Sequence, residues 1–308
     1  MTTIQPTTPR TTEAIRELGG TGLAREIRAR AAANAAELAE TGITPGLAVV
    51  VATDDESSAW YVRSIARAAG KAGIDCRTVD LGPGAEPERI RAALEKLSAD
   101  ESVHGIILQT PLPAEAHFEE LASAIDPRKD VDGANPVSLG NLAAGLPAHP
   151  PATAAAVLEL LDHHEIELAG RNCVVVGRSN VVGKPVAQLL LQRDATVTVC
   201  HRHTPELTAF TPDADVLVVA VGKPGLITDK HVRDGSVVVD VGTNPTADGG
   251  LVGDVEPSVR VAGLTPVPGG VGPVTTALLL QHTVRSAIRT ARQVGNTADP
   301  RLRPGQEC

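Results

Sequence analysis

The chain has 308 residues, of which 42% are hydrophobic and only 1% aromatic, so one large or two ordinary domains must pack around alanine, valine, leucine and isoleucine. Its formal net charge of -9 argues against non-specific binding to nucleic acid, which needs a basic surface. No apolar run approaches the roughly 20 residues of a membrane span, and the polar opening Met1–Arg10 lacks the apolar stretch of a signal peptide, so we expect a cytoplasmic protein without a membrane partner.

Strands and helices alternate through the first half of the chain. A helical pattern covers roughly residues 12–41. The elements expected after it are strand 47–53, helix 57–72, strand 76–81, helix 86–99 and strand 105–109. Such alternation predicts a parallel sheet with helices on both faces. The Pro-, Gly- and Asn-rich region 126–151 breaks the pattern, and we expect a domain boundary there.

The second half repeats the alternation. The expected elements are helix 153–163, strand 172–176, helix 182–193, and strands 195–200, 215–221 and 236–241. A glycine- and proline-dense stretch at 263–273 then precedes a final amphipathic helix at about 274–294. The polar termini, residues 1–10 and 296–308, are expected to be flexible tails.

The first strand of the second half runs directly into a glycine turn. Val174–Val176 are followed by Gly177-Arg178-Ser179-Asn180-Val181-Val182-Gly183-Lys184-Pro185 and then by a helical pattern. This arrangement presents backbone N–H groups and a helix N-terminus to a pyrophosphate, so it favours a dinucleotide. The turn departs from G-x-G-x-x-G, because Ser179 replaces the second glycine and Gly183 comes one residue late. A plain strand-to-helix loop is the alternative interpretation.

The strand at 195–200 indicates which dinucleotide is bound. An NAD-binding unit usually ends this strand with Asp or Glu, which accepts hydrogen bonds from the ribose. Here the strand ends in His201-Arg202-His203-Thr204. Arg202 and the nearby Arg178 suit a 2′-phosphate, so NADP is favoured over NAD. The alternative is that both arginines are solvated loop residues.

Five motifs in chain order resemble one known family. They are Tyr61-Val62 on the helix 57–72, the segments Gly105–Pro113, Lys129–Gly133 and Gly177–Pro185, and Thr265–Pro273. The family is the bifunctional methylenetetrahydrofolate dehydrogenase/methenyltetrahydrofolate cyclohydrolase family, and the resemblance spans roughly residues 12–290. The late glycine of the turn is also the family's pattern.

The resemblance implies an α/β protein of two domains with an active cleft between them. An N-terminal three-layer α/β catalytic domain would comprise residues 11–150 plus 275–295, and a Rossmann-type NADP-binding domain residues 151–274. The C-terminal helix would pack back on the first domain. The family forms homodimers, and it oxidises 5,10-methylenetetrahydrofolate with NADP before hydrolysing the methenyl product to 10-formyltetrahydrofolate. The four cysteines show no metal-ligand spacing, and no metal is expected.

Three residues match the family's catalytic and substrate-binding positions. Tyr61, the only tyrosine, offers a ring face to a pterin or aminobenzoyl ring. Gln109 ends a strand, where open α/β sheets place ligands, and Asp132 matches the carboxylate that would hold pterin N–H groups. Outside the family, the same three residues are read as a core ring, a loop-capping amide and a turn aspartate.

The resemblance also implies contacts from both glycine-rich segments. Substrate contacts are expected at Pro268, Gly269 and Gly270, where the alternative is an ordinary surface turn. Cofactor contacts are expected at Gly177, Arg178, Ser179, Val182, Gly183, His201, Arg202, Val221, Gly222, Thr243 and Gly272.

The catalytic lysine of the family is absent. It follows the tyrosine by four residues, and here that position is Ile65. Arg63 and Arg67 point roughly 200° away from Ile65 around the helix, and Lys71 is also off its face. Hydride departure depends mainly on positioning, whereas hydrolysis needs an activated water, for which acid–base help contributes about 10²–10⁴-fold. We therefore predict a dehydrogenase whose cyclohydrolase activity is weak or absent.

Further departures from the family lie at Pro151–Ala156, Thr243 and Val274, and they indicate a diverged paralogue. Two alternatives stay open. One is a non-catalytic protein that binds folate or NADP, and the other is a related nicotinamide-dependent enzyme with an altered substrate.

Overall fold

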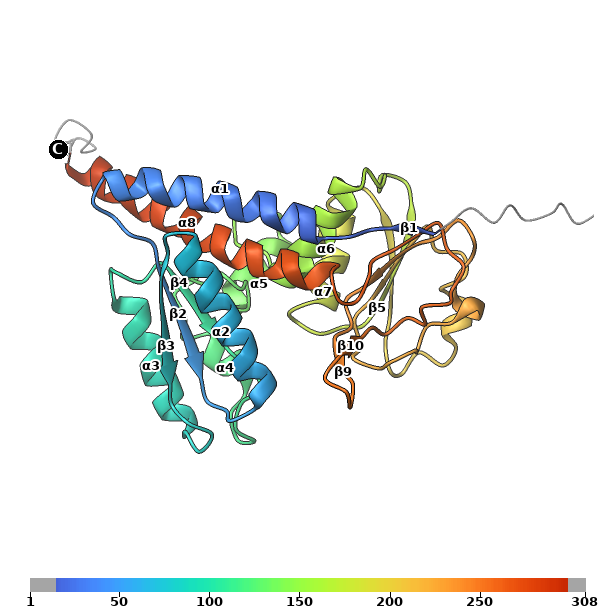
Figure 1. The fold of residues 1–308 in the computed structure, drawn as a ribbon, viewed down its shortest axis with the longest axis horizontal. Coiled ribbons are helices and arrows are strands. Elements are labelled where there is room, and N and C mark those ends of the chain that lie inside the picture. Colours follow the sequence, from blue (N-terminus) through green and yellow to red (C-terminus); the bar gives the residue numbers. More distant parts are fainter. Residues whose placement is uncertain (1–14, 299–308) are drawn as a thin grey trace, which may run out of the picture.

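The computed structural model describes residues 15–298. It contains two sheets of parallel strands, which lie side by side and are joined by two long helices (Figure 1). The helices are α1 (Thr21–Glu40) and α8 (Val271–Ala298), and they run next to each other across both halves of the molecule. The predicted two-domain α/β architecture is confirmed.

The first sheet has the order β3-β2-β4, with β2 (Gly46–Val51) between β3 (Asp75–Asp80) and β4 (Gly105–Leu108). Side chains alternate along β2, so Leu47 and Val49 pack on one face while Ala48 and Val50 pack on the other. The first face is covered by α2 (Glu56–Lys71), α1 and α8, and the second by α3 (Pro87–Ala99) and α4 (Phe118–Ala122). This is the three-layer arrangement expected of the first domain.

The second sheet has six parallel strands in the order β1-β11-β8-β7-β5-β6. The strands are β1 (Arg16–Glu17), β5 (Asn172–Val176), β6 (Thr196–Cys200), β7 (Val216–Val219), β8 (Val237–Asp240) and β11 (Gly263–Leu264). One face is covered by α6 (Ala152–His163), α7 (Gly183–Leu191) and the first turns of α8.

The opposite face of this second sheet differs from the prediction of helices on both faces. In the part of the chain that the structure describes, that face carries only the 3₁₀ helices η1 (Leu207–Ala209) and η2 (Asp229–His231), with loop residues such as Val255 and Val259. Short β-branched side chains fill this core, so a loop layer suffices to bury them. The strands β9 (Asn244–Pro245) and β10 (Leu251–Val252) form a separate antiparallel hairpin.

The first helix begins later than the sequence pattern suggested. The prediction of a helix from residue 12 is wrong, because Arg16–Glu17 form β1 and pair with β11 of the second sheet. A tight contact explains the break. The amide of Gly20 donates to the carbonyl of Gly269 at 2.8 Å, and a Cβ at Gly20 would lie 2.1 Å from the carbonyl oxygen of Gly270.

Most other predicted elements are found within a few residues of their expected bounds. The final helix starts at Val271, because Pro273 is tolerated in a first turn, where no intrahelical N–H bond is lost. The proposed boundary region contains the short helix α5 (Pro136–Ala143). Of the expected tails, residues 1–10 and 299–308 lie outside the described residues, and residues 296–298 belong to α8.

The helices α1 and α8 each contribute to both hydrophobic cores. Their N-terminal halves pack with the second sheet, and their later turns pack with the first, so the C-terminal helix packs back on the first domain as expected. The residues in the second core are Leu23, Ala24, Ile27, Val271, Val274 and Leu278, and those in the first are Ala31, Ala35, Leu280 and Val284. Across residues 15–298, none of the helices has the length and apolarity that crossing a membrane requires.

Candidate active site

Tyr61 and Gln109 meet in one cavity of about 490 Å³. Helix α2 is fixed at its start by Asp55, whose carboxylate accepts the N–H of Ser58 at 2.7 Å. Tyr61 lies on the next turn of α2 and faces the segment that follows β4, where Gln109 and Pro111 line the same cavity. The sequence prediction that these two side chains share a site is therefore consistent with the geometry.

Gln109 is held by its backbone and keeps one side-chain atom free. Its N–H donates to the carbonyl of Val50 at 2.9 Å, and its Nε2 donates to the carbonyl of Thr110 at 2.7 Å. No donor among the described residues reaches Oε1 of Gln109. That oxygen is available to accept a hydrogen bond in the cavity.

Asp132 sits on a loop that is fixed from both sides. The neighbouring Asp130 is fully buried, and its carboxylate accepts the N–H groups of Ala134 and Asn135 at 3.0 and 2.8 Å. Gly133 has φ +67°, and a Cβ there would lie 2.4 Å from the nitrogen of Pro151. Burial, with the charge of Asp130, raises the pKa of Asp132 to about 7.

Tyr61 interacts with Asp132 and with a residue that the sequence interpretation missed. Burial, and then the charge of Asp132, raise the pKa of Tyr61 to about 12, so its phenol stays protonated at neutral pH. The side chain of Thr276 on α8 partly offsets this rise in the pKa of Tyr61, while its hydroxyl donates to the carbonyl of Gly272 at 3.4 Å. The position of Thr276, three residues after the end of the glycine-rich segment 263–273, is the signal that could have identified it.

Ile65 is buried in the core below the cavity. It is 0% exposed and packs in the apolar cluster that includes Val62, Leu280 and Val284. An isoleucine neither carries charge nor moves a proton. The described lining of the Tyr61 cavity contains no lysine, and Arg63 and Arg67 are exposed.

A buried histidine pair anchors the loop that carries Asp132. His282 on α8 contacts the carbonyl of Val131 through Nδ1 at 2.8 Å. His149 Nε2 lies 3.0 Å from Oγ of Ser286, which donates to the carbonyl of Arg128 at 2.9 Å. Burial lowers the pKa of His149 to about 3 and that of His282 to about 4, so both rings are neutral. Sequence reasoning did not single out either histidine.

The glycine turn has the shape of a phosphate cradle. Gly177 has φ +132°, and a Cβ there would lie 2.3 Å from the carbonyl oxygen of Ala220. A Cβ at Gly183 would lie 2.2 Å from the carbonyl oxygen of Gly177. Ser179 Oγ accepts the N–H groups of Val182 and Gly183 at 3.2 and 3.4 Å, so the serine in place of the second glycine closes the turn just before α7.

Donors remain free at this turn. Within residues 15–298, the backbone N–H groups of Arg178 and Ser179 have no acceptor, as expected where an anionic ligand supplies one. The side chains of Arg178 and Arg202 are exposed, and neither forms an ion pair in the described part of the chain. They follow the neighbouring strands β5 and β6, which pair Val176 with Cys200. The residues present thus fit a phosphorylated dinucleotide.

The remaining predicted contacts lie around the same edge of the second sheet. Backbone N–H groups of Val221 and Gly222 donate to the buried carboxylate of Asp254 at 2.8 and 3.0 Å, so these amides are engaged within the protein. His201 closes its loop by donating its N–H to Thr204 Oγ1 at 2.9 Å. Thr243, Pro268 and Gly272 are exposed, whereas Gly269 is half-buried and Gly270 is buried, where α8 begins.

One side-chain bond joins the glycine turn to the first domain. Asn180 Nδ2 donates to Oε1 of Glu119 on α4 at 2.8 Å, and Lys184 Nζ donates to Asn180 Oδ1 at 2.7 Å. The turn is therefore in direct contact with the first domain. Among the residues that the structure describes, no group of three or more His, Cys, Asp or Glu side chains is placed to hold a metal ion.

Comparison with known proteins assigns both halves of the chain. Residues 18–132 match the family described as tetrahydrofolate dehydrogenase/cyclohydrolase, catalytic domain. Residues 151–291 match tetrahydrofolate dehydrogenase/cyclohydrolase, NAD(P)-binding domain.

Named relatives and solved structures cover almost the whole chain. Bifunctional protein FolD 1 of Saccharopolyspora erythraea is 73% identical over 282 residues, which is 91% of this chain and 96% of the relative. Bifunctional protein FolD 1 of Rhodococcus jostii is 64% identical, over 88% of this chain and 93% of the relative. The bifunctional enzyme FolD of Campylobacter jejuni has a TM-score of 0.87 at 38% identity, covering 90% of this chain and 99% of that one. The Trypanosoma brucei FolD structure, complexed with NADP cofactor and inhibitor, has a TM-score of 0.86 at 36% identity over the same shares.

Proposed function

The chain belongs to the tetrahydrofolate dehydrogenase/cyclohydrolase family, and we propose that it oxidises 5,10-methylenetetrahydrofolate to the methenyl compound with NADP while the family's hydrolysis to 10-formyltetrahydrofolate is weak or lost. The observation that carries this proposal is Ile65, which is 0% exposed at the position of the family's lysine. The oxidation and the hydrolysis place different demands on that position.

Oxidation depends on alignment, which this cleft supplies. Asp132, as a carboxylate, would accept the pterin's N–H groups, and the Tyr61 ring would lie against the flat part of the substrate. The free Oε1 of Gln109 gives a second polar contact in the cavity. Fixing the reacting carbon in this way supplies most of what hydride departure requires.

The cofactor is NADP. The second domain matches the family's NAD(P)-binding domain. When bound, NADP supplies the acceptor for the hydride. Gly177 and Gly183 allow close backbone approach at the turn, and the free N–H groups of Arg178 and Ser179 would hold the pyrophosphate. The guanidinium groups of Arg178 and Arg202 suit the 2′-phosphate, for which NAD has no counterpart.

Hydrolysis lacks its proton-transfer group in this cavity. Ile65 is buried in the same apolar cluster as Leu280 and Val284 and presents no donor or acceptor to a water molecule. Tyr61 has a pKa of about 12 and does not act as a base at neutral pH. Loss of general acid–base help corresponds to about 10²–10⁴-fold in rate.

Two assays on the purified protein test this proposal. Methylenetetrahydrofolate with NADP should give NADPH, followed by its absorbance, with NAD giving a much slower reaction. Methenyltetrahydrofolate offered alone should disappear at close to the buffer rate. Brisk enzyme-dependent hydrolysis would contradict the loss of the second activity, and failure to form NADPH would favour a non-catalytic paralogue or an altered substrate.

The proposal includes a homodimer in the cytoplasm. The strand β6 forms an outer edge of the second sheet, where Val199 is 39% exposed. Leu191, on the adjoining helix α7, is 57% exposed. An open strand edge with apolar side chains beside it is a surface that a second copy would cover.

A further inference from the structure

A fully buried carboxylate, Asp254, ties together the loops at the carboxyl edge of the second sheet. Its Oδ2 accepts the N–H groups of Val221 and Gly222 at 2.8 and 3.0 Å. Its Oδ1 accepts the N–H of Lys223 at 2.7 Å and a side-chain N–H of Asn244 at 2.9 Å. All four donors are neutral amides, which orient dipoles toward the carboxylate but bring no net charge. The negative charge of Asp254 therefore stays in place.

A second buried carboxylate, Asp240 at the end of β8, holds the backbone of Asp254. Its Oδ1 accepts the N–H groups of Gly242 and Asp254 at 2.9 and 3.0 Å, and its Oδ2 accepts that of Val255 at 2.9 Å. A Cβ at Gly242 would lie 2.4 Å from Oδ1 of Asp254, so a side chain there would displace that carboxylate. Burial raises the pKa of Asp240, so we assign the lasting negative charge to Asp254.

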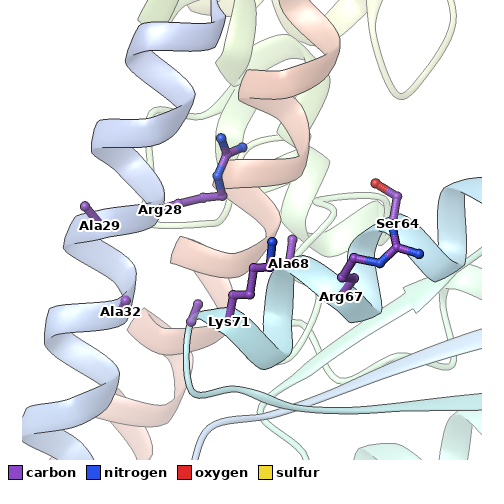
Figure 2. Close-up of a pocket in the computed structure, with 8 residues that line it drawn as sticks. Arg28, Ala29, Ala32, Ser64, Arg67, Ala68 and Lys71 are labelled. Atoms are coloured by element: carbon purple, nitrogen blue, oxygen red, sulfur yellow. The ribbon is translucent and has the colours of Figure 1, made fainter.

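No cation is paired with Asp254. Within residues 15–298, neither it nor Asp240 takes part in an ion pair, and Lys223 is exposed. A cluster of cations is found instead in the first domain, where a cavity of about 440 Å³ between α1 and α2 is lined by Arg28, Arg67 and Lys71 (Figure 2). The charge of Asp254 thus acts on its surroundings without a cationic partner.

The strand order places Asp254 beside the nicotinamide half of the cofactor site. The strands β6, β5, β7 and β8 are neighbours in that order. Arg202, proposed for the 2′-phosphate, follows β6, and the glycine turn, proposed for the pyrophosphate, follows β5. A dinucleotide lies across the carboxyl ends of such strands. Its nicotinamide half then extends over the ends of β7 and β8, where Asp254 binds residues 221–223.

We propose that Asp254 is a positioning residue that selects the oxidised form of the cofactor. It holds residues 221–223 as a surface beside the nicotinamide, and its charge favours the cationic ring of NADP over the neutral ring of NADPH. The two forms differ by one hydride, which cancels the positive charge of the ring. This inference rests on the proposed placement of the cofactor. It implies that NADP is captured tightly and that NADPH, the product of the proposed oxidation, leaves readily.

Calorimetric binding of NADP and of NADPH to the purified protein, without folate, tests this inference. The wild type should bind NADP about tenfold more tightly, which is the effect of one unit charge acting over about 12 Å at an effective dielectric constant of about 20. In Asp254→Asn, which keeps the shape and removes the charge, the ratio of the two Kd values should fall to near one. A purely structural role would raise both Kd values by the same factor and leave their ratio unchanged.

The matched control is Asp215→Asn in the same sheet. Asp215 precedes β7 at the opposite edge, where it accepts the N–H of Asn172 at 2.9 Å and pairs with Arg233. It therefore resembles Asp254 in binding the backbone of a neighbouring strand, but it lies at the far end of β7. Removing its charge should leave the ratio of the two Kd values as in the wild type.

Several results would overturn the proposal. They are a wild type that binds NADPH at least as tightly as NADP, a ratio that Asp254→Asn leaves unchanged, and an equal fall of the ratio in Asp215→Asn. The wild-type comparison needs no variant, so it decides the matter even if circular dichroism shows that Asp254→Asn does not fold. Binding of neither form would overturn the cofactor assignment itself. NADPH formation from methylenetetrahydrofolate, with an unchanged ratio in Asp254→Asn, would end this inference and leave the proposed function standing.

Discussion

At the scale of single residues, Ile65, which stands where the family has a lysine, suits the apolar surroundings of its position. The side chain packs fully within the cluster formed by α1, α2 and α8. An ammonium group introduced there must leave that cluster to reach the cavity that Asp55, Tyr61 and Gln109 line. The proposed loss of hydrolysis therefore involves the packing of this position as well as its chemistry.

Restoring the lysine tests this view. Ile65→Lys should raise hydrolysis of methenyltetrahydrofolate by roughly 10-fold or more, because acid–base help contributes about 10²–10⁴-fold when well placed. NADP reduction should remain measurable, and the protein should lose some stability on denaturation. Ile65→Met, of similar length and without charge, is the control and should not gain hydrolysis. No gain with lysine would mean that the loss extends beyond one side chain.

Asp132 should impose a pH dependence on substrate capture. Its pKa is raised to about 7 by burial and by Asp130, so the carboxylate that we propose holds the pterin is protonated as the pH falls below that value. We expect kcat/KM to fall about tenfold per pH unit well below pH 7, since this parameter reports the free enzyme. Asp132→Asn should lower kcat/KM by roughly 10–100-fold and flatten the profile. If Asp132→Asn shows the same decline of kcat/KM at low pH, another titrating group causes that decline.

At the scale of elements, the histidine pair fixes the loop of Asp132 to α8, and it does so only while uncharged. Both folded-state pKa values, about 3 and about 4, lie below the ordinary 6.5. Their contribution to stability is present above pH 6.5 and is lost as the pH falls, because the unfolded chain takes up the protons first.

The expected loss can be measured by chemical denaturation at pH 7.5 and pH 5. At pH 5 the two buried rings together should cost about 4 kcal/mol of unfolding free energy, from 1.36 kcal/mol per pKa unit over about 1.5 units for each ring. The variant His149→Gln/His282→Gln has no imidazole at either site and should lose clearly less between the two pH values. An equal loss of unfolding free energy in both proteins would show that carboxylates elsewhere cause most of the destabilisation at low pH.

The elements also show what a sequence can and cannot predict. Strands such as β2 and helices such as α2 follow from local periodicity and capping, and they were predicted closely. The start of α1 was predicted too early, because it depends on the close approach of Gly20 to the backbone of Gly270, some 250 residues away in the chain. The engagement of the Val221 amide by Asp254 is likewise a long-range contact. The resemblance supplied Asp132, whereas Thr276 emerged only when α8 and α2 were placed together.

At the scale of the whole molecule, the edge of the second sheet should decide the oligomeric state. Light scattering of the wild type should give the mass of a dimer, and Val199→Lys/Leu191→Lys should give that of a monomer, because two charges would be buried without partners. Leu146→Lys is the control, since it adds a charge at another exposed leucine of the first domain. A wild type that is already monomeric would end the homodimer proposal.

The two long helices have a consequence for how this architecture can be rearranged. Because α1 and α8 each supply side chains to both cores, neither half carries a complete interior of its own. Cutting the chain near residue 150 should yield fragments that expose apolar surface and precipitate when produced separately. The nucleotide-binding half is thus not an exchangeable cassette, and any chimera between relatives must keep α1 and α8 from a single parent.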